Sequence, residues 1–247
     1  MLNHPTLDKL YELHLTGMAR AWQEQLQSDQ YDSLSFDERL AFLVEREYEE
    51  RNNRRLKTRL SKARLRLQAA IEDIDYRTNR GLDKRLMLAL AECAWIREHH
   101  NGIITGPTGA GKTYLACALG NKACREGFTV QYFRAPRLLG ELTLAKADGR
   151  YPKIMTALAK TDLLILDDWA TALLTDDNRR DMLEIMEDRY QRRSTLVAAQ
   201  LPLEHWHKAI ADPTLADAIL DRLVHNAHKI TLKGDSMRKK KQTLNID

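Results

Sequence analysis

The sequence predicts an α/β fold with a central parallel sheet, preceded by a small all-helical domain. Three observations lead to this prediction. Strand-like and helix-like runs alternate after residue 100, whereas no strand-like run precedes that point. The run DLLILDD at 162–168 has consecutive apolar residues, as expected for a central strand that is covered on both faces. A glycine-rich stretch joins the first predicted strand to a predicted helix.

Residues 1–75 form the predicted helical domain. Apolar residues recur every three to four positions, which indicates one face of a helix; they are Leu7, Tyr11, Leu15, Met18, Trp22 and Leu26. Ser35 and Glu38 have the spacing of a capping box at the start of a second helix. The segment DYRTNRGLDKR at 75–85 is interpreted as the linker to a second domain at 76–247.

Five strands and the helices between them make up the second domain. We predict strands at 102–105, 129–135, 162–168, 194–200 and 228–234. The intervening helices are predicted at 112–126, 137–148, 152–160, 177–192 and 214–226. This alternation favours a parallel five-stranded sheet flanked by helices.

Residues 106–113, GPTGAGKT, match the pattern GxxxxGK[ST] at every fixed position, directly after a predicted strand and before a predicted helix. The glycines let backbone N–H groups curl around phosphates, and the helix N-terminus adds the positive end of its dipole. Lys112 is expected to reach the β- and γ-phosphate oxygens of ATP. The predicted ATP-binding residues are Gly106, Pro107, Thr108, Gly109, Ala110, Gly111, Lys112, Thr113 and Tyr114.

Two aspartates end the strand predicted at 162–168. Asp167 follows four apolar residues, so it is expected at the end of a strand beside the phosphate-binding loop. There it would hold Mg²⁺ together with the Thr113 hydroxyl. Asp168 is placed to orient or deprotonate the attacking water in ATP hydrolysis; the alternative is a helix or turn cap.

Basic residues crowd one predicted helix. Five of them have helical spacing and form one row; they are Arg51, Arg55, Arg59, Lys62 and Arg66. We call this set the basic row. A row of cations beside an apolar stripe fits contact with the phosphate backbone of DNA, but it fits equally well a solvated face paired with Glu47, Glu49 and Glu50.

Composition indicates a folded protein, because 43% of the 247 residues are hydrophobic and only 30% are charged. The apolar run at 86–96 is too short to cross a bilayer, so no membrane association is expected. The N-terminus has no signal-peptide pattern, and the three cysteines include no CxxC pair. We therefore expect a cytoplasmic protein with reduced thiols.

Several motifs together resemble the IstB/DnaC branch of the AAA+ ATPases. They are GPTGAGKT, DLLILDD, the strand end AAQ, DRL and SMRKK. GIITGPTGAGKT and AAQLPLEHWH are most similar to IstB-type transposition helper proteins of bacterial insertion sequences. The resemblance extends over essentially the whole chain, including LTGMA at 15–19. It implies an AAA+ core.

The resemblance also implies roles for three residues. Gln200 matches the position that senses the γ-phosphate. Arg222 matches the arginine finger, which reaches the nucleotide of the adjacent subunit, and Arg238 matches the second sensor arginine. Alternatively, Arg222 could pair with Asp217 or Asp221, and Arg238 could belong to a solvated basic tail.

The sequence departs from the AAA+ pattern in two places. Asp167-Asp168 stands where many AAA+ proteins have Asp-Glu, and the shorter side chain would slow hydrolysis if it must reach the water. About a dozen residues follow the last predicted strand, so no C-terminal helical lid is expected. Closure of the nucleotide site would then depend on a neighbouring subunit.

The function implied by the resemblance is that of an ATP-dependent DNA-binding ATPase. Such a protein would form a homo-oligomeric ring or helical assembly on double-stranded DNA and help the cognate transposase to capture its target. A DnaC-type loader of a replicative helicase is an alternative with the same chemistry. A small-molecule phosphotransferase, which would need a second pocket and arginines in cis, and a module that binds ATP without hydrolysing it are alternatives from other classes.

Overall fold

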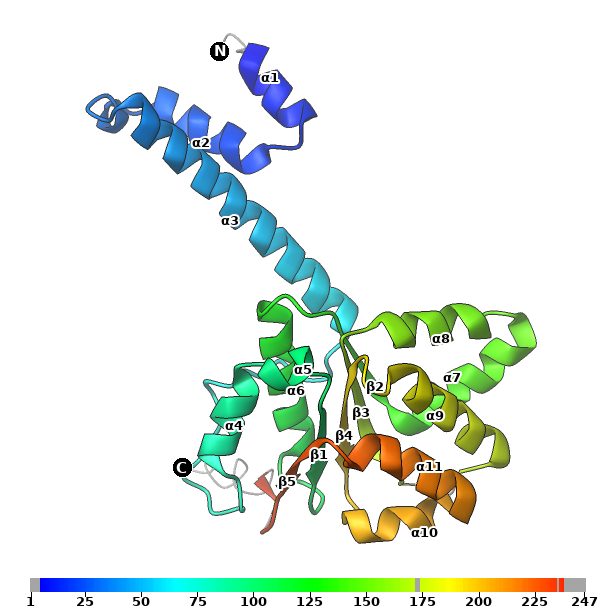
Figure 1. The fold of residues 1–247 in the computed structure, drawn as a ribbon. Coiled ribbons are helices and arrows are strands. Elements are labelled where there is room, and N and C mark those ends of the chain that lie inside the picture. Colours follow the sequence, from blue (N-terminus) through cyan, green and yellow to red (C-terminus); the bar gives the residue numbers. More distant parts are fainter. Residues whose placement is uncertain (1–4, 172–173, 235, 238–247) are drawn as a thin grey trace, which may run out of the picture. The chain divides into compact units, whose positions relative to one another are not determined.

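In the computed structural model, which describes residues 5–171, 174–234 and 236–237, five strands form one sheet in the order β2-β3-β4-β1-β5 (Figure 1). They are β1 (Asn101–Thr105), β2 (Val130–Arg134), β3 (Leu163–Trp169), β4 (Ser194–Ala199) and β5 (Ala227–Thr231). Every neighbouring pair is parallel. The predicted five-stranded parallel sheet is therefore confirmed.

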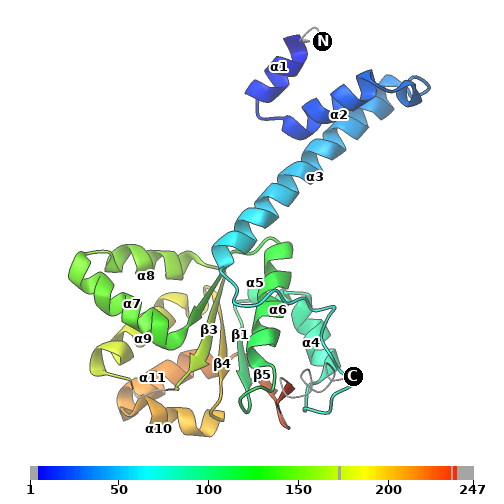
Figure 2. The same cartoon turned by 180° about the vertical axis from the view of Figure 1, so that it is seen from behind.

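Helices cover both faces of the sheet, as Figure 2 shows from behind. One face carries α4 (Lys84–Ala91), α5 (Ala94–Arg97) and α6 (Lys112–Arg125). The other carries α7 (Ala135–Asp148), α8 (Tyr151–Lys160), α9 (Asp176–Arg189), α10 (Trp206–Ile210) and α11 (Pro213–Val224). The four apolar residues of β3 at 163–166 are fully buried, because alternate side chains enter the two cores.

Parallel pairing brings the carboxyl ends of the strands to one edge of the sheet. Arg134 at the end of β2 is in register with Asp167 of β3. Thr105 at the end of β1 is in register with Ala199, the residue before Gln200. Residues that are far apart in the sequence therefore meet at this edge, which is where open α/β sheets bind ligands.

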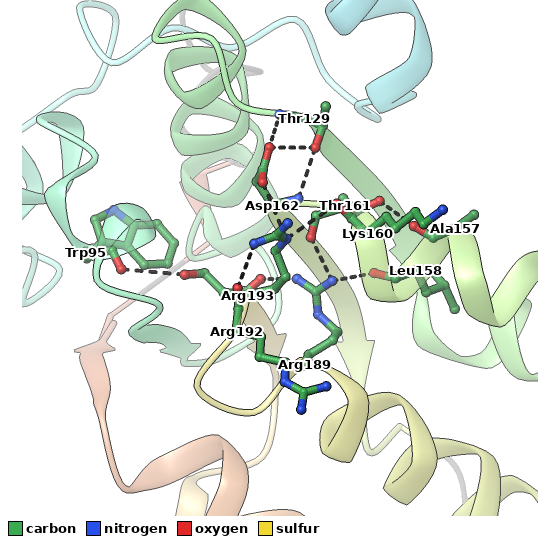
Figure 3. A network of polar contacts seen from close by, with 11 residues as sticks. Trp95, Thr129, Ala157, Leu158, Lys160, Thr161, Asp162, Arg189, Arg192 and Arg193 are labelled. Atoms are coloured by element: carbon green, nitrogen blue, oxygen red, sulfur yellow. Dashed lines mark hydrogen bonds and ion pairs between the residues drawn. The ribbon is translucent and has the colours of Figure 1, made fainter.

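A buried arginine connects helices and strands at the opposite edge, as Figure 3 shows. Arg189 at the end of α9 is only 1% exposed. Its guanidinium donates hydrogen bonds to the carbonyl oxygens of Leu158, Thr161 and Ser194 and to the Thr195 hydroxyl. Burial lowers the pKa of Arg189 to about 9, so the group remains cationic at neutral pH. One side chain thus satisfies backbone acceptors at the C-terminal end of α8 and at the start of β4.

Replacing Arg189 by leucine should lower the free energy of unfolding by about 3–5 kcal/mol, because buried carbonyl groups lose their donors. Urea denaturation would measure the loss. The control is Arg193→Leu in the same network: Arg193 is 37% exposed and lies 3.5 Å from Asp162, so about 1 kcal/mol or less is expected. Equal destabilisation by the two variants would contradict a structural role specific to Arg189.

The chain divides into two compact units, residues 1–58 and 59–247. The first unit contains α1 (Pro5–Glu12), α2 (Thr16–Leu26), the short 3₁₀ helix η1 (Asp29–Tyr31) and most of α3 (Phe36–Ala63). The single helix that the apolar stripe predicted over Leu7–Leu26 is wrong. The chain turns between α1 and α2, where His14 has a left-handed backbone conformation with φ 57°.

The predicted capping box at the start of α3 is confirmed. The Ser35 N–H donates to Glu38 Oε2 at 2.8 Å, and the Glu38 N–H donates back to Ser35 Oγ at 3.4 Å. Each group satisfies a backbone donor at the helix start that has no partner within the helix.

A buried carboxylate joins α2 to α3 within the first unit. Glu47 accepts hydrogen bonds from the N–H groups of Gly17 (2.8 Å) and Met18 (3.1 Å) and from Arg51 Nε (2.6 Å). Burial raises the pKa of Glu47, but these three donors outweigh it and the net pKa is lowered. A Cβ at Gly17 would lie 2.7 Å from the Arg46 carbonyl oxygen, so glycine in LTGMA permits this close approach.

The boundary between the compact units lies inside α3, whereas the sequence analysis placed the domain boundary at 75/76. Residues 64–83 contain neither helix nor strand and belong to the second unit. Across the described ranges, no helix has the length and apolarity that a membrane span requires.

Candidate nucleotide-binding site

The loop 106–111 connects β1 to α6 at the carboxyl edge of the sheet. Gly111 precedes the first residue of α6 and has φ 101°, a conformation that side-chain-bearing residues rarely adopt. A Cβ at this position would also collide with Arg80 Nη1. The first backbone N–H groups of α6 have no acceptors within the helix, so they are available to an anionic ligand.

Lys112 lies folded over this loop. Its Nζ donates hydrogen bonds to the carbonyl oxygens of Gly106 at 2.8 Å and Pro107 at 2.9 Å. The ammonium group therefore lies within the loop that the sequence predicted to surround the phosphates. A β- or γ-phosphate oxygen in the loop would be a stronger acceptor than these neutral carbonyls.

Thr113 and Asp167 meet as the sequence predicted. Thr113 Oγ1 donates to Asp167 Oδ2 at 2.7 Å, and Asp167 is only 1% exposed. The Tyr132 hydroxyl donates to the same oxygen at 2.6 Å, and the Asp168 N–H donates to Oδ1 at 2.9 Å. These donors hold the carboxylate in one orientation. Burial, followed by the bond to Asp167, raises the pKa of Tyr132, so this hydroxyl is protonated at neutral pH.

Asp168 lies beside two arginines. Arg134 Nε donates to Asp168 Oδ2 at 2.6 Å, and Arg66 Nη1 lies 3.8 Å from the same oxygen. Asp168 has φ 56°, and the pairing of β3 with β4 shifts register between Leu166 and Trp169. This irregularity turns Asp168 out of the buried strand, with 32% of its side chain exposed. The helix-cap alternative does not describe this position, because Asp168 belongs to β3.

A cavity of about 470 Å³ lies beside these groups, and Lys112, Thr113 and Asp168 line it. Its charged lining residues are Arg66, Asp73, Asp75, Arg80, Lys112, Arg134 and Asp168. Thr108, Gly109, Gly111, Thr113, Tyr114 and Gln200 also line it, so most of the predicted phosphate-binding segment borders one space. Gln200, at the end of β4, thus lies in the same cavity as Lys112, which is compatible with its predicted sensor role.

Arg238 lies outside the described residues. Its neighbour Met237 lines the cavity, and the Met237 N–H donates to the Gly109 carbonyl oxygen at 2.9 Å. The part of the chain that the structure describes therefore reaches the phosphate-binding loop one residue before Arg238.

Arg222 lies on α11 and, within the described part of the chain, does not line the cavity. Its Nη2 lies 2.8 Å from Glu187 Oε1, and its Nη1 donates to the Ala218 carbonyl oxygen at 2.8 Å. The acidic partner is thus Glu187 rather than Asp217 or Asp221. Because the side chain is 27% exposed, the guanidinium is partly accessible from outside the protomer.

The predicted helix does not extend to Arg66, so the basic row is not a single row on one helix. The helix α3 ends at Ala63, and Arg64 has φ 51°, so Arg66 leaves the helix and lines the cavity. Arg51 is paired with Glu47. Arg59 donates to the Cys124 carbonyl oxygen at 2.8 Å, whereas Arg55 and Lys62 are exposed.

Several residues of this site were not identified from the sequence, and four of them contact the loop, Asp167 or Asp168 directly. Tyr132 and Arg134 could have been found, because parallel pairing places the end of β2 beside Asp167. Arg66 and Arg80 lie in the irregular segment 64–83, where no local pattern indicates which side chains reach the loop.

A strand, a glycine loop with a lysine, and a helix define a P-loop nucleotide-binding protein with an AAA+-like α/β fold, in which the aspartate that meets Thr113 ends β3, with β4 between β3 and β1. A sequence model of the family described as IstB-like ATP binding protein matches residues 8–245. The chain belongs to this family of insertion-sequence ATP-binding proteins.

Two relatives illustrate this membership. The insertion-sequence protein y4pL of Sinorhizobium fredii is 53% identical, with 97% of this chain and 98% of the relative covered. The insertion sequence IS21 protein of Pseudomonas aeruginosa is 30% identical, with 96% of this chain and 88% of the relative covered.

Solved structures show the same fold at low sequence identity. The DnaC helicase loader has a TM-score of 0.57 and 17% identity, covering 67% of this chain and 97% of that chain. The replication initiator DnaA bound to AMPPCP and single-stranded DNA has a TM-score of 0.57 and 17% identity, covering 74% of this chain and 57% of that chain. The AAA+-like core is thereby confirmed.

Proposed function

We propose that this protein is an Mg²⁺-dependent ATPase that assembles on double-stranded DNA and assists the transposase of its insertion sequence in capturing a target. The observation that carries the proposal is the 2.7 Å contact between Thr113 Oγ1 and Asp167 Oδ2 beside the Lys112 loop, in a chain of the IstB-like family. A threonine hydroxyl and a strand-end carboxylate are oxygen donors of the kind that hold Mg²⁺ beside a bound triphosphate.

The residues of the cavity support the chemistry of hydrolysis. Lys112 and the N–H groups at the start of α6 bind and orient the phosphates, while Tyr132 holds the Asp167 carboxylate in place. Mg²⁺ would be held by Thr113 and Asp167, and it would neutralise charge that develops on the phosphate oxygens. Asp168, whose side chain is 32% exposed, would orient the attacking water.

The proposed assembly depends on Arg222. In this proposal it leaves Glu187 and contacts the nucleotide of a neighbouring protomer, so that ATP joins two subunits. The assembly then presents cations to DNA, and hydrolysis resets it. Because the nucleotide contributes binding energy at the junction, it shifts the oligomerisation equilibrium.

Two exposed members of the basic row, Arg55 and Lys62, supply the test of DNA contact. Replacing both Arg55 and Lys62 by alanine should weaken DNA binding and reduce the slope of log affinity against log salt by about 2, since each lost phosphate contact removes roughly 0.9. Fluorescence anisotropy at several salt concentrations, with ATP present, measures this slope.

The control removes two cations elsewhere, with Lys153→Ala on α8 and Lys208→Ala on α10; both residues are exposed. This variant should retain the wild-type slope. An unchanged slope in the Arg55/Lys62 variant would show that the row is only a solvated helix face. Absence of any DNA binding by the wild-type protein with ATP would remove DNA from the proposal.

A phosphotransferase remains the second candidate, because Arg66, Arg80 and Arg134 line the cavity in cis and such enzymes need cis arginines. The two functions differ in what stimulates turnover. Stimulation of phosphate release by double-stranded DNA supports the assembly factor. Stimulation by a small acceptor, with transfer of the phosphoryl group to it, supports the phosphotransferase.

A further inference from the structure

Segment 64–83, together with the last turn of α3, follows one side of α6. Arg59 bonds to the carbonyl of Cys124, and a Cβ at Gly120 would lie 2.9 Å from Leu65. Nearer the start of α6, Cys117 and Tyr114 interact with the backbone of residues 66–67 and 70, respectively. The segment therefore runs from the end of α6 to its beginning, where the phosphate-binding loop lies.

Because segment 64–83 follows this path along α6, Arg66 lines the cavity although it belongs to neither a helix nor a strand. Its Nη1 lies 3.8 Å from Asp168 Oδ2, and the guanidinium also interacts with the Tyr132 hydroxyl. The side chain is 44% exposed, so it can change its position at the cost of its contacts with Asp168 and the Tyr132 hydroxyl. Arg66 thus lies beside the aspartate that the proposed function assigns to the attacking water.

The other cations of the cavity have closer partners. Arg134 lies 2.6 Å from Asp168, and Lys112 donates to two loop carbonyls. Arg80 is 5% exposed and donates to the Ala110 carbonyl oxygen at 2.9 Å. Among these contacts, the one between Arg66 Nη1 and Asp168 Oδ2, at 3.8 Å, is the longest. When Arg66 moves, Asp168 retains Arg134, so no carboxylate is left without a cationic partner.

We infer that Arg66 is a nucleotide-binding arginine supplied in cis, which exchanges Asp168 for the terminal phosphate of a bound nucleoside triphosphate. The inference rests on the proposed function of the cavity. A terminal phosphate carries more charge than a carboxylate and accepts both branches of a guanidinium fork, so it outcompetes a contact of 3.8 Å. When a triphosphate is bound, Asp168 loses its contact with Arg66. When a diphosphate is bound, Arg66 keeps its contact with Asp168.

The test compares Arg66→Gln with wild type for binding of a non-hydrolysable ATP analogue and of ADP, by calorimetry at protein concentrations that keep the chain monomeric. The variant should bind the triphosphate about 10- to 100-fold more weakly and ADP within about twofold. Arg66→Lys should recover part of the triphosphate affinity. The control is Arg77→Gln, which removes an exposed arginine from the same segment and should change neither affinity.

The outcomes separate this inference from the proposed function. If Lys112→Ala abolishes binding of both nucleotides while Arg66→Gln changes both equally or neither, only the role of Arg66 is overturned. If the wild type binds neither nucleotide, both proposals fail. If Arg66→Gln instead lowers the salt slope of DNA binding and leaves nucleotide preference intact, Arg66 belongs to the DNA contact and the inference is wrong.

Discussion

Lys112→Ala should lower the affinity for ATP by roughly a hundredfold or more and abolish ATP-dependent assembly. Lys112 Nζ lies over the phosphate-binding loop, 2.8 Å from the Gly106 carbonyl oxygen, where a bound triphosphate would place its β and γ oxygens. Two charge-assisted hydrogen bonds of about 1.5–3 kcal/mol each account for a loss of that size. Calorimetry measures the affinity, and sedimentation velocity with and without ATP measures the assembly.

The matched control is Lys153→Ala, which removes an exposed lysine from α8 and should leave both measurements unchanged. Thermal denaturation checks that the Lys112 variant is folded. Unaltered oligomers of Lys112→Ala in the presence of ATP would contradict the proposal that the nucleotide joins the subunits.

Arg222→Ala should retain ATP affinity but lower turnover by about three orders of magnitude, because an arginine finger stabilises charge that develops only in the transition state. Arg222 does not line the described part of the cavity of its own protomer, and it lies 2.8 Å from Glu187. To act on the nucleotide of its own chain, Arg222 would have to reach from α11 to the phosphate-binding loop. To act on the nucleotide of a neighbouring subunit, it need only break its ion pair with Glu187. Phosphate release under saturating ATP measures the effect, with Arg85→Ala on α4 as the exposed-arginine control.

Subunit mixing distinguishes the two modes of action. Arg222→Ala protomers keep the Lys112 loop, and Lys112→Ala protomers keep Arg222, so each is inactive alone. Mixed assemblies should recover turnover if Arg222 acts on the neighbouring nucleotide. Mixtures as inactive as their parents would place Arg222 in a purely structural pair with Glu187.

Prediction from the sequence succeeded where the determinants are short in range. The β3 strand was recognised because its four apolar residues are consecutive, and the capping box of Ser35 and Glu38 because its two partners are three residues apart. The sequence pattern did not reveal the turn after α1 or the end of α3. Helical spacing continues through both places in the sequence, and only packing of the flanking segments shows where each helix stops.

For the basic row, too, spacing in the sequence was not sufficient to predict which side chains share a surface. Five cations with helical spacing predicted one surface, but Arg51 is paired with Glu47 and Arg66 lies in the nucleotide cavity. The residues next to a charged side chain in the sequence do not show whether that side chain faces solvent or lines a site. The assignment depends on which partner the folded backbone brings near it.

Sequence patterns alone were sufficient to predict the α/β core, the ATP-binding loop and the meeting of Thr113 with Asp167, because a contiguous glycine motif and a buried strand specify their own backbone geometry. Contacts across the folded chain were needed to show that Tyr132 holds Asp167 and that Arg134, Arg66 and Arg80 line the cavity. Strand register brings the first two to Asp167 and Asp168, and the course of segment 64–83 along α6 brings the other two, so contacts across the fold rather than local propensity place them.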